Sequence, residues 1–286
     1  EALEIVNLEV TKLYCNIALN IIPKFKENDI IIHLAARQYH LNVPNKNKLL
    51  WFRKVNATGT KNVINHCLKC KVKGLIYFST DMVYGSPLFV PLTTDHPKNP
   101  IGPYGQSKLE AEKLCILARK KGLAITILRP RLIMGAGRLG VMKKLFESIF
   151  LNLPVPIIGS GKNYYQMVSV KDCSEAVILT VKNNFPNYEL NLGSEVESNV
   201  KNLLGSLIKK VNSKSKIITL PALPIKIILN ILEKIGIPIL YKEQFKIADK
   251  NYIVDISDTY SKIGWKPKQS DKDMIVAAYK YWKNIK

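Results

Sequence analysis

Residues 74–79 (GLIYFS) and 123–128 (LAITIL) are two short apolar runs, and residues 105–121 (GQSKLEAEKLCILARKK) lie between them with the periodicity of an amphipathic helix. A strand, a helix and a second strand in this order predict parallel strands joined by a crossover helix. Because both strands are apolar along their whole length, the sheet is expected to be buried on both faces. This stretch therefore predicts an α/β fold with a doubly wound parallel sheet.

The alternation of apolar runs and amphipathic segments continues in both directions along the chain. Each further apolar run has the length of a strand, and each amphipathic segment has the length of a helix. The expected strands are residues 5–10, 29–34 and 188–192, and the expected helices are residues 49–70, 172–182 (with Asp172 as N-cap), 199–211 and 274–286. In such a sheet a ligand lies beyond the carboxyl ends of the strands, so the site is expected there.

The net charge of the chain limits the kinds of partner that the protein is expected to bind. The 286 residues include 43 Lys and Arg against 22 Asp and Glu, which gives a formal net charge of +21. Only six of the basic residues are Arg, and the Lys are spread along the whole chain. Since Arg makes most of the paired contacts to bases and phosphates, no nucleic-acid partner is expected. A general compositional bias, or an acidic or phosphorylated ligand, accounts for the charge.

The cysteines and one long apolar segment exclude other classes. Five scattered cysteines predict a reducing, cytoplasmic setting, and the Cys67-x-x-Cys70 pair has no second pair or histidine cluster, so no metal site is expected. Residues 217–240 (IITLPALPIKIILNILEKIGIPIL) are apolar, but three Pro and three charged residues interrupt them, so no stable membrane span is expected. We expect a buried amphipathic helix there, with a helix lying on a membrane surface as the alternative.

Tyr104 and Lys108 are the first candidates for chemistry. They lie four residues apart at the start of the helix predicted over 105–121, so their side chains share one face. A neighbouring ammonium favours the phenolate and lowers the pKa of a tyrosine, which lets the pair move a proton at a carbonyl or alcohol. Thr80 directly follows the strand of residues 74–79, and its hydroxyl can hydrogen-bond the same substrate oxygen.

The order of several short motifs resembles the NAD-dependent epimerase/dehydratase family of the extended short-chain dehydrogenase/reductase superfamily. No single piece is decisive, but all occur in the family's order and together cover essentially the whole chain. The matching pieces are His33-Leu34-Ala35-Ala36, Asn56-x-x-Gly59-Thr60, residues 79–85 (STDMVYG), Pro103-Tyr104-Gly105-x-Ser107-Lys108, Leu128-Arg129-Pro130 with Gly135, Val170-x-Asp172, Asn191-Leu192-Gly193 and Ile263-Gly264-Trp265-Lys266-Pro267.

The resemblance implies hydride chemistry on NAD or NADP, with roles for particular residues. Tyr104 would be the acid/base, Lys108 would assist it and touch the nicotinamide ribose, Thr80 would position the reacting oxygen, and Asn56 would support the helix that carries the pair. The implied cofactor contacts are Leu34, Ala35, Ala36, Ser79, Tyr104, Lys108 and Pro130. The implied substrate contacts are Thr80, Asp81, Met82, Arg131, Arg138 and Tyr165.

The resemblance also implies a division of the chain. Residues 1–130 would form a partial, Rossmann-like NAD(P)-binding domain, and residues 131–286 would form mainly a smaller substrate-binding lobe. From that second part, residues 168–193 would return to the sheet. The family's habit of pairing through helices such as residues 49–70 and 105–121 makes a homodimer an open expectation.

The largest departure from the family pattern is at the N-terminus. The family opens with a strand, a Gly-x-x-Gly-x-x-Gly turn and a helix that holds the pyrophosphate, yet no Gly precedes Gly59. Residues 5–10 (IVNLEV) instead resemble the family's third strand, with Glu9 near the position that faces adenine. The chain is therefore expected to begin inside the fold, short of a first unit of about 50–60 residues.

Two further departures concern the substrate. Met82 stands where sugar-nucleotide 4,6-dehydratases carry a Glu, and a thioether cannot remove the ring proton that elimination of water requires. Leu132 and Tyr165 stand where epimerases carry an Asn and an Arg, and Arg131 and Arg138 are substitutes in the same loops. We predict an oxidoreductase or 4-epimerase acting on a sugar nucleotide or related alcohol. The alternatives are a sterol- or isoprenoid-type 3β-hydroxysteroid-like dehydrogenase and a non-catalytic NAD-binding protein.

Overall fold

A four-stranded parallel sheet in the order β1-β2-β3-β7 forms the centre of the computed structural model, which describes residues 10–286. The strands are β1 (Ile30–His33), β2 (Gly74–Phe78), β3 (Ile125–Pro130) and β7 (Glu189–Leu192). In the register of the inner pairs, Ile76 lies opposite Thr126 and Leu128 lies opposite Leu190. The predicted parallel α/β fold is confirmed, while the strand predicted over residues 5–10 falls, apart from its last residue, outside the described residues.

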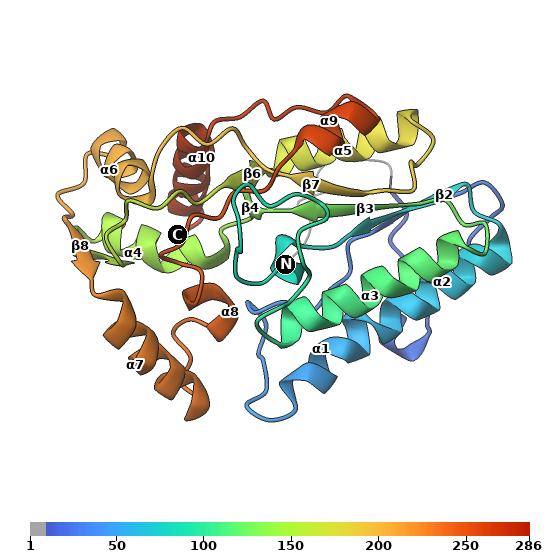
Figure 1. Cartoon of the computed structure of the whole chain (residues 1–286), viewed down its shortest axis with the longest axis horizontal. Helices are drawn as coiled ribbons and strands as arrows, with labels where there is room; N and C mark the ends of the chain where they lie inside the picture. The colour runs from blue at the N-terminus through green and yellow to red at the C-terminus, as the bar shows by residue number, and fades with distance from the viewer. Residues whose placement is uncertain (1–9) are drawn as a thin grey trace.

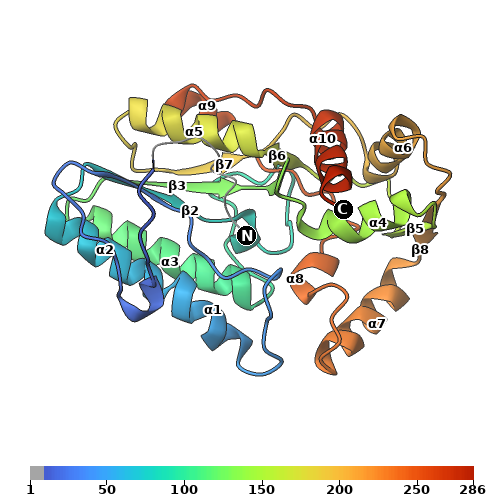
Figure 2. The same ribbon diagram turned by 180° about the vertical axis from the view of Figure 1, so that it is seen from behind.

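Helices cover both faces of this sheet (Figures 1 and 2). The helices α1 (Lys48–Asn56), α2 (Thr58–Cys70) and α3 (Pro103–Arg119) lie on one face, and α5 (Val170–Lys182) and α9 (Ser257–Ile263) lie on the other. Successive strand residues point to opposite faces, so Leu75 and Tyr77 join the cluster under α2 and α3 while Ile76 joins the cluster under α5. Burial on both faces explains why β2 is apolar along its length and why the polar residues of β3, Thr126 and Arg129, are themselves fully buried.

Strand β1 departs from the expected burial. Ile30 and Ile32 are 41% and 45% exposed, whereas Leu75, Ile76 and Tyr77 of β2 are fully buried. Within the described residues β1 pairs with β2 alone, which places β1 at the edge of the sheet. Its outward side chains therefore lack the cover that the inner strands receive.

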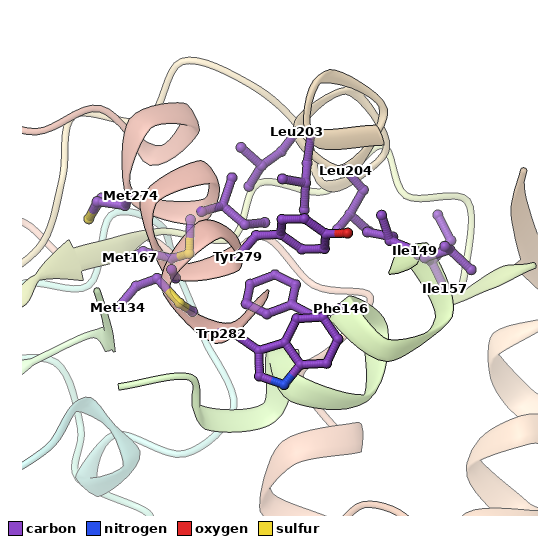
Figure 3. Packing of buried hydrophobic residues seen from close by; sticks show 14 residues of the cluster. Met134, Phe146, Ile149, Ile157, Met167, Leu203, Leu204, Met274, Tyr279 and Trp282 are labelled. Carbon is purple, nitrogen blue, oxygen red and sulfur yellow. The ribbon is translucent and has the colours of Figure 1, made fainter. Parts of the chain in front are cut away.

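The rest of the chain surrounds a second core beside the carboxyl ends of the strands. Two small parallel sheets, β4–β6 and β5–β8, lie among the helices of this part. Figure 3 shows Phe146, Tyr279 and Trp282 facing one another, with Leu203 and Leu204 close by. The elements are β4 (Leu132–Met134), α4 (Lys143–Phe150), β5 (Val155–Ile158), β6 (Met167–Ser169), α6 (Val200–Lys210), β8 (Ile217–Leu220), α7 (Ala222–Lys234), α8 (Lys242–Phe245) and α10 (Asp271–Asn284), with short 3-10 turns η1 (Ile17–Leu19), η2 (Asp81–Val83) and η3 (Gly140–Met142).

Two helix predictions need correction. The helix expected over residues 49–70 is two helices that meet at Ala57, where the Thr60 hydroxyl donates a hydrogen bond to the Asn56 carbonyl at 2.7 Å. The N-cap of α5 is Ser169 and not Asp172, because the Ser169 hydroxyl accepts the Asp172 backbone N–H at 2.8 Å. Asp172 lies instead in the first turn, where its carboxylate accepts the Lys268 backbone N–H.

The prediction of a buried helix over residues 217–240 is wrong in two respects. Residues 217–220 form strand β8, and the apolar side chains of the helix that follows are mostly exposed. Leu229 is the one buried residue of this helix, α7. Hydrophobic content alone did not indicate what covers each face. No helix among residues 10–286 is long and apolar enough to cross a membrane.

Candidate active site

The candidate site lies where β2 ends and α3 begins. Ser79 and Thr80 follow β2 directly, and the Thr80 hydroxyl accepts the Met82 backbone N–H at 3.3 Å as the N-cap of η2. Pro103 occupies the first turn of α3, where its missing N–H costs nothing, and Tyr104 follows it. Gly105 allows the close approach of these two segments, since a Cβ there would lie 2.6 Å from the Met82 carbonyl oxygen. The sequence motifs on either side of this contact are thus held together by backbone packing.

Tyr104 is 9% exposed and lies among other aromatic rings. Its ring centroid is 5.8 Å from that of Phe52 and 5.9 Å from that of Tyr39. Burial raises the pKa of Tyr104, the carboxylate of Glu243 raises it further, and a hydrogen bond with Thr80 lowers it. The net effect is a phenol that keeps its proton at neutral pH, as a proton donor to a substrate oxygen requires.

The expectation that Lys108 lowers the pKa of Tyr104 is not met. The Lys108 ammonium donates to the Phe78 carbonyl at 2.6 Å and lies 4.2 Å from the centroid of the Tyr77 ring. Burial lowers the pKa of Lys108 itself to about 7, and the cation that lowers the pKa of Tyr104 is Arg138. Lys108 is therefore a buried amine that gains or loses a proton near neutral pH.

Asn56 connects α1 to the helix that carries Tyr104. Its fully buried amide donates to the Ser107 hydroxyl at 2.9 Å, and that hydroxyl donates to the Tyr104 carbonyl at 2.7 Å. The Asn56 amide also exchanges hydrogen bonds with the Arg37 backbone N–H and carbonyl. These contacts place Asn56 as a support for the first turn of α3, in agreement with the role that the resemblance implies.

Glu243 is a residue of this site that the sequence did not indicate. Its carboxylate, 1% exposed, accepts the backbone N–H groups of Tyr104 at 2.8 Å and Gly105 at 3.1 Å, and the hydroxyl of Tyr39 at 2.6 Å. An acceptor at this point satisfies N–H groups that have no partner within α3 and complements the positive end of its dipole. Glu243 lies 139 residues from Tyr104 in α8, so no local spacing could reveal it.

Three of the predicted substrate residues form one buried cluster. Arg131, 2% exposed, donates to the Asp81 carboxylate at 2.5 Å, and its guanidinium lies 4.1 Å from the ring centroids of both Tyr165 and Tyr252. Two of its nitrogens, Nε and one terminal amine, have no hydrogen-bond partner among the described residues. The structure thus brings Asp81, Arg131 and Tyr165 together beside Thr80, whose hydroxyl donates to Asp81 at 3.1 Å.

The remaining predicted substrate residues lie around this cluster. Met82 is half-buried in η2 and packs against the core that contains Val83 and Tyr84. Arg138 donates to the side chain of Gln38, which joins the loop after β1 to the loop after β4. Arg138 is close enough to Tyr104 to lower its pKa, so both residues face the same region.

The predicted cofactor contacts lie at the carboxyl ends of three neighbouring strands. Leu34 is 62% exposed and Ala35 is exposed directly after β1, and Pro130 is buried at the end of β3 opposite Leu192. Ala36 is half-buried beside them. The Ser79 hydroxyl is buried without a hydrogen-bond partner among residues 10–286, and such an orphaned group fits a position that a ligand hydroxyl or amide completes. These residues fit a nicotinamide cofactor that lies across the carboxyl ends of β1, β2 and β3.

Glu243 gives the protein a testable pH dependence. Burial raises its pKa from 4.5 to about 7, so the folded protein binds a proton there that the unfolded chain has already released between these two values. Stability tied to Glu243 is therefore full below about pH 4.5 and falls as pH rises through 7, by up to about 3 kcal/mol. We expect urea unfolding to show a larger loss of stability between pH 5 and 8 for the wild type than for Glu243→Gln.

The difference between the pH profiles of the wild type and Glu243→Gln reports the Glu243 carboxyl. Burial also shifts the pKa values of His33 and Asp271, but both residues are present in both proteins. Parallel pH profiles for the two proteins would show that Glu243 titrates normally in the folded state.

The chain was also compared with models of known protein families. The model of the "NAD dependent epimerase/dehydratase family" matches residues 3–193, which include β1, β2, α3, β3 and β7. The chain belongs to the NAD-dependent epimerase/dehydratase family. The matched residues include the whole four-stranded sheet and the two segments that carry Thr80 and Tyr104. The family resemblance is thereby confirmed.

Three relatives with curated descriptions are 27–30% identical to the chain over the aligned residues. The uncharacterised protein y4nG of Sinorhizobium fredii is 28% identical over 89% of this chain and 63% of its own length. A putative UDP-glucose 4-epimerase of Methanocaldococcus jannaschii is 27% identical over 68% and 65%. An N-acetyl-alpha-D-glucosaminyl-diphospho-ditrans,octacis-undecaprenol 4-epimerase of Escherichia coli is 30% identical over 58% and 51%. The chain thus spans about half to two thirds of the length of these relatives.

A solved structure supports the family fold. UDP-glucuronic acid 4-epimerase from Bacillus cereus, in complex with UDP-glucuronic acid and NAD, superposes with a TM-score of 0.72 at 22% identity, over 90% of this chain and 76% of that one. At this level of identity the likeness concerns the fold.

Proposed function

We propose that this protein is an NAD(P)-dependent oxidoreductase or 4-epimerase that acts on a sugar carried by a diphosphate, most simply a sugar nucleotide. The observation that carries the proposal is the placement of two buried residues at the carboxyl end of β2: Tyr104 in the first turn of α3 and Thr80 directly after the strand, with the buried amine of Lys108 one turn along α3. The family membership and the 4-epimerases among the curated relatives support the same reaction class.

The proposed reaction depends on the protonation states of Tyr104 and Lys108. The cofactor supplies a hydride acceptor when it is bound. To take the proton of the substrate hydroxyl as its carbon is oxidised to a carbonyl, Tyr104 must first release the proton that it holds in the free protein. Thr80 would hydrogen-bond the substrate oxygen. Lys108, with a pKa lowered to about 7, can exchange a proton at neutral pH and lies on the same helix. In an epimerase the steps then run backwards on the opposite face of the sugar, and Tyr104 returns its proton.

Dehydration is disfavoured by the residues next to Thr80. Elimination of water needs a free acid and a base beside the sugar ring, yet Met82 has no ionisable group. The Asp81 carboxylate is paired with Arg131 at 2.5 Å, with side chains 4% and 1% exposed. The Asp81 carboxylate is therefore engaged by Arg131 and is not free to act on a substrate.

The experiment is a substrate survey with the protein produced from its complete gene. UDP- and dTDP-hexoses are incubated with NAD or NADP, the reduced cofactor is followed by absorbance, and products are identified by NMR. Interconversion of 4-epimers without accumulation of reduced cofactor is the expected result. Stoichiometric formation of reduced cofactor from one of these hexoses would instead identify the oxidoreductase of the proposal. A protein that binds the cofactor and converts no alcohol or sugar would contradict the proposal and favour the non-catalytic alternative.

A further inference from the structure

Helix α7 and the loop after it present an unusual concentration of exposed apolar side chains. Each member of the group is more than half exposed, between 51% and 73%. We name this group the α7 apolar surface, and its members are Leu223, Ile227, Ile228, Ile231, Ile235, Ile237 and Ile239. The four helical members follow one another at spacings of four, one and three residues, which places them on one side of the helix, while Leu229 on the opposite side is buried. A contiguous apolar surface of this kind indicates a binding surface.

The charges around the α7 apolar surface have one sign. The acidic groups of this segment are already engaged: Glu233 pairs with Lys48 at 2.9 Å, and Asp249 pairs with Lys226. Exposed Lys234, Lys242 and Lys246 complete its border, and none of their side-chain amines has an ion-pair partner in the part of the chain that the structure describes. An apolar stripe bordered by unpaired ammonium groups is complementary to an anionic surface with an apolar interior.

The placement of α7 suits a flat partner. In both views of the molecule α7 projects from the body next to α8, away from the central sheet (Figures 1 and 2). With 13 residues it is too short to span a bilayer, but an amphipathic helix of this length can lie in the interface. The net charge of +21 also opposes a second copy of the same chain on this surface, because like charges would meet across it.

We propose that the α7 apolar surface binds the protein to an anionic lipid membrane, with α7 lying in the plane of the lipid–water interface. This inference does not depend on the proposed reaction. It has a consequence for the site, because α8 follows α7 and its Glu243 accepts the first backbone N–H groups of α3. Tyr241, in the same connection, stacks on Tyr39 at 4.1 Å between ring centroids. Membrane binding would therefore place the start of α3 close to the lipid surface.

The test is cosedimentation with vesicles of phosphatidylcholine alone and of phosphatidylcholine with phosphatidylglycerol. We expect the wild type to bind the anionic vesicles and to be released by added salt, which screens the lysines. Ile227→Ser with Ile231→Ser should weaken binding at least tenfold, since each buried isoleucine contributes more than the ~1.4 kcal/mol that a tenfold change represents. Lys234→Glu with Lys242→Glu should abolish the preference for anionic vesicles.

Ile178→Ser is the matched control, because Ile178 is 54% exposed on α5, on the opposite side of the sheet, and this variant should bind as the wild type does. Circular dichroism confirms that each variant is folded. Equal vesicle binding by the Ile227/Ile231 variant and the wild type would overturn the proposal. So would a wild type that ignores vesicles, or one that forms a dimer in light scattering which the double substitution dissolves, since a second copy would then cover the surface.

Discussion

Tyr104→Phe is expected to lower kcat/KM by roughly 10²–10⁴-fold while cofactor binding stays within a few-fold of the wild type. The substitution removes one hydroxyl and leaves the ring, which packs against Phe52 and Tyr39. The first turn of α3 remains anchored through Glu243 and Ser107, whose contacts are to the backbone. The loss therefore reports proton transfer and not misfolding.

The measurement is the conversion rate of the best substrate found in the survey, together with cofactor affinity by fluorescence titration. Tyr260→Phe is the control, because the Tyr260 side chain is 52% exposed on α9, on the far face of the sheet from α3. It should keep wild-type turnover. Turnover of Tyr104→Phe at the wild-type rate would remove Tyr104 from the mechanism.

Arg129→Met is expected to destabilise the fold by roughly 3–5 kcal/mol. Arg129 and Glu112 form a two-pronged ion pair at 2.8 and 2.9 Å, and their side chains are 0% and 1% exposed. The Arg129 guanidinium also donates to the Tyr84 hydroxyl at 3.0 Å, and that hydroxyl donates to Asn191 at 2.7 Å. Without the arginine, a carboxylate and a hydroxyl stay buried with fewer partners, which is where the cost arises.

Urea unfolding of three proteins measures this effect. Arg53→Met is the control, since the Arg53–Glu110 pair has the same chemistry but side chains that are 45% and 32% exposed, and its loss should cost at most about 1 kcal/mol. Glu112→Leu combined with Arg129→Met should recover much of the loss, because no buried charge then remains unpaired. A double variant that is less stable than Arg129→Met alone would show that the ion pair itself, and not the orphaned charge, dominates.

The sequence was sufficient to predict the elements whose short-range residue pattern reflects their burial in the fold. Strand β2 and the predicted run of residues 123–128 are largely apolar because both faces of the sheet are covered, and the sequence shows this pattern within six residues. The pair of Tyr104 and Lys108 was found for a similar reason, since a helix repeats its faces every three to four residues. Thr80 was found because it directly follows a buried strand.

The tertiary structure decided what depends on contacts between distant residues. Glu243 reaches Tyr104 across 139 residues, and Arg131 is enclosed by Asp81, Tyr165 and Tyr252, which approach it from separate segments. Burial of Tyr104 and the carboxylate of Glu243 raise the pKa of Tyr104 although a lysine lies one turn away, and both depend on the tertiary structure.

For α7, too, the sequence predicted the helix and the tertiary structure decided its exposure. The sequence predicted an amphipathic helix within residues 217–240, and the structure has a helix there over residues 222–234, after strand β8. Whether its apolar stripe faces a core or the outside could not be derived from that pattern, since the hydrophobic periodicity of a helix is the same for either partner. Only the folded chain shows that the stripe is left uncovered, because it depends on where α7 leaves β8 and how α8 anchors it to α3.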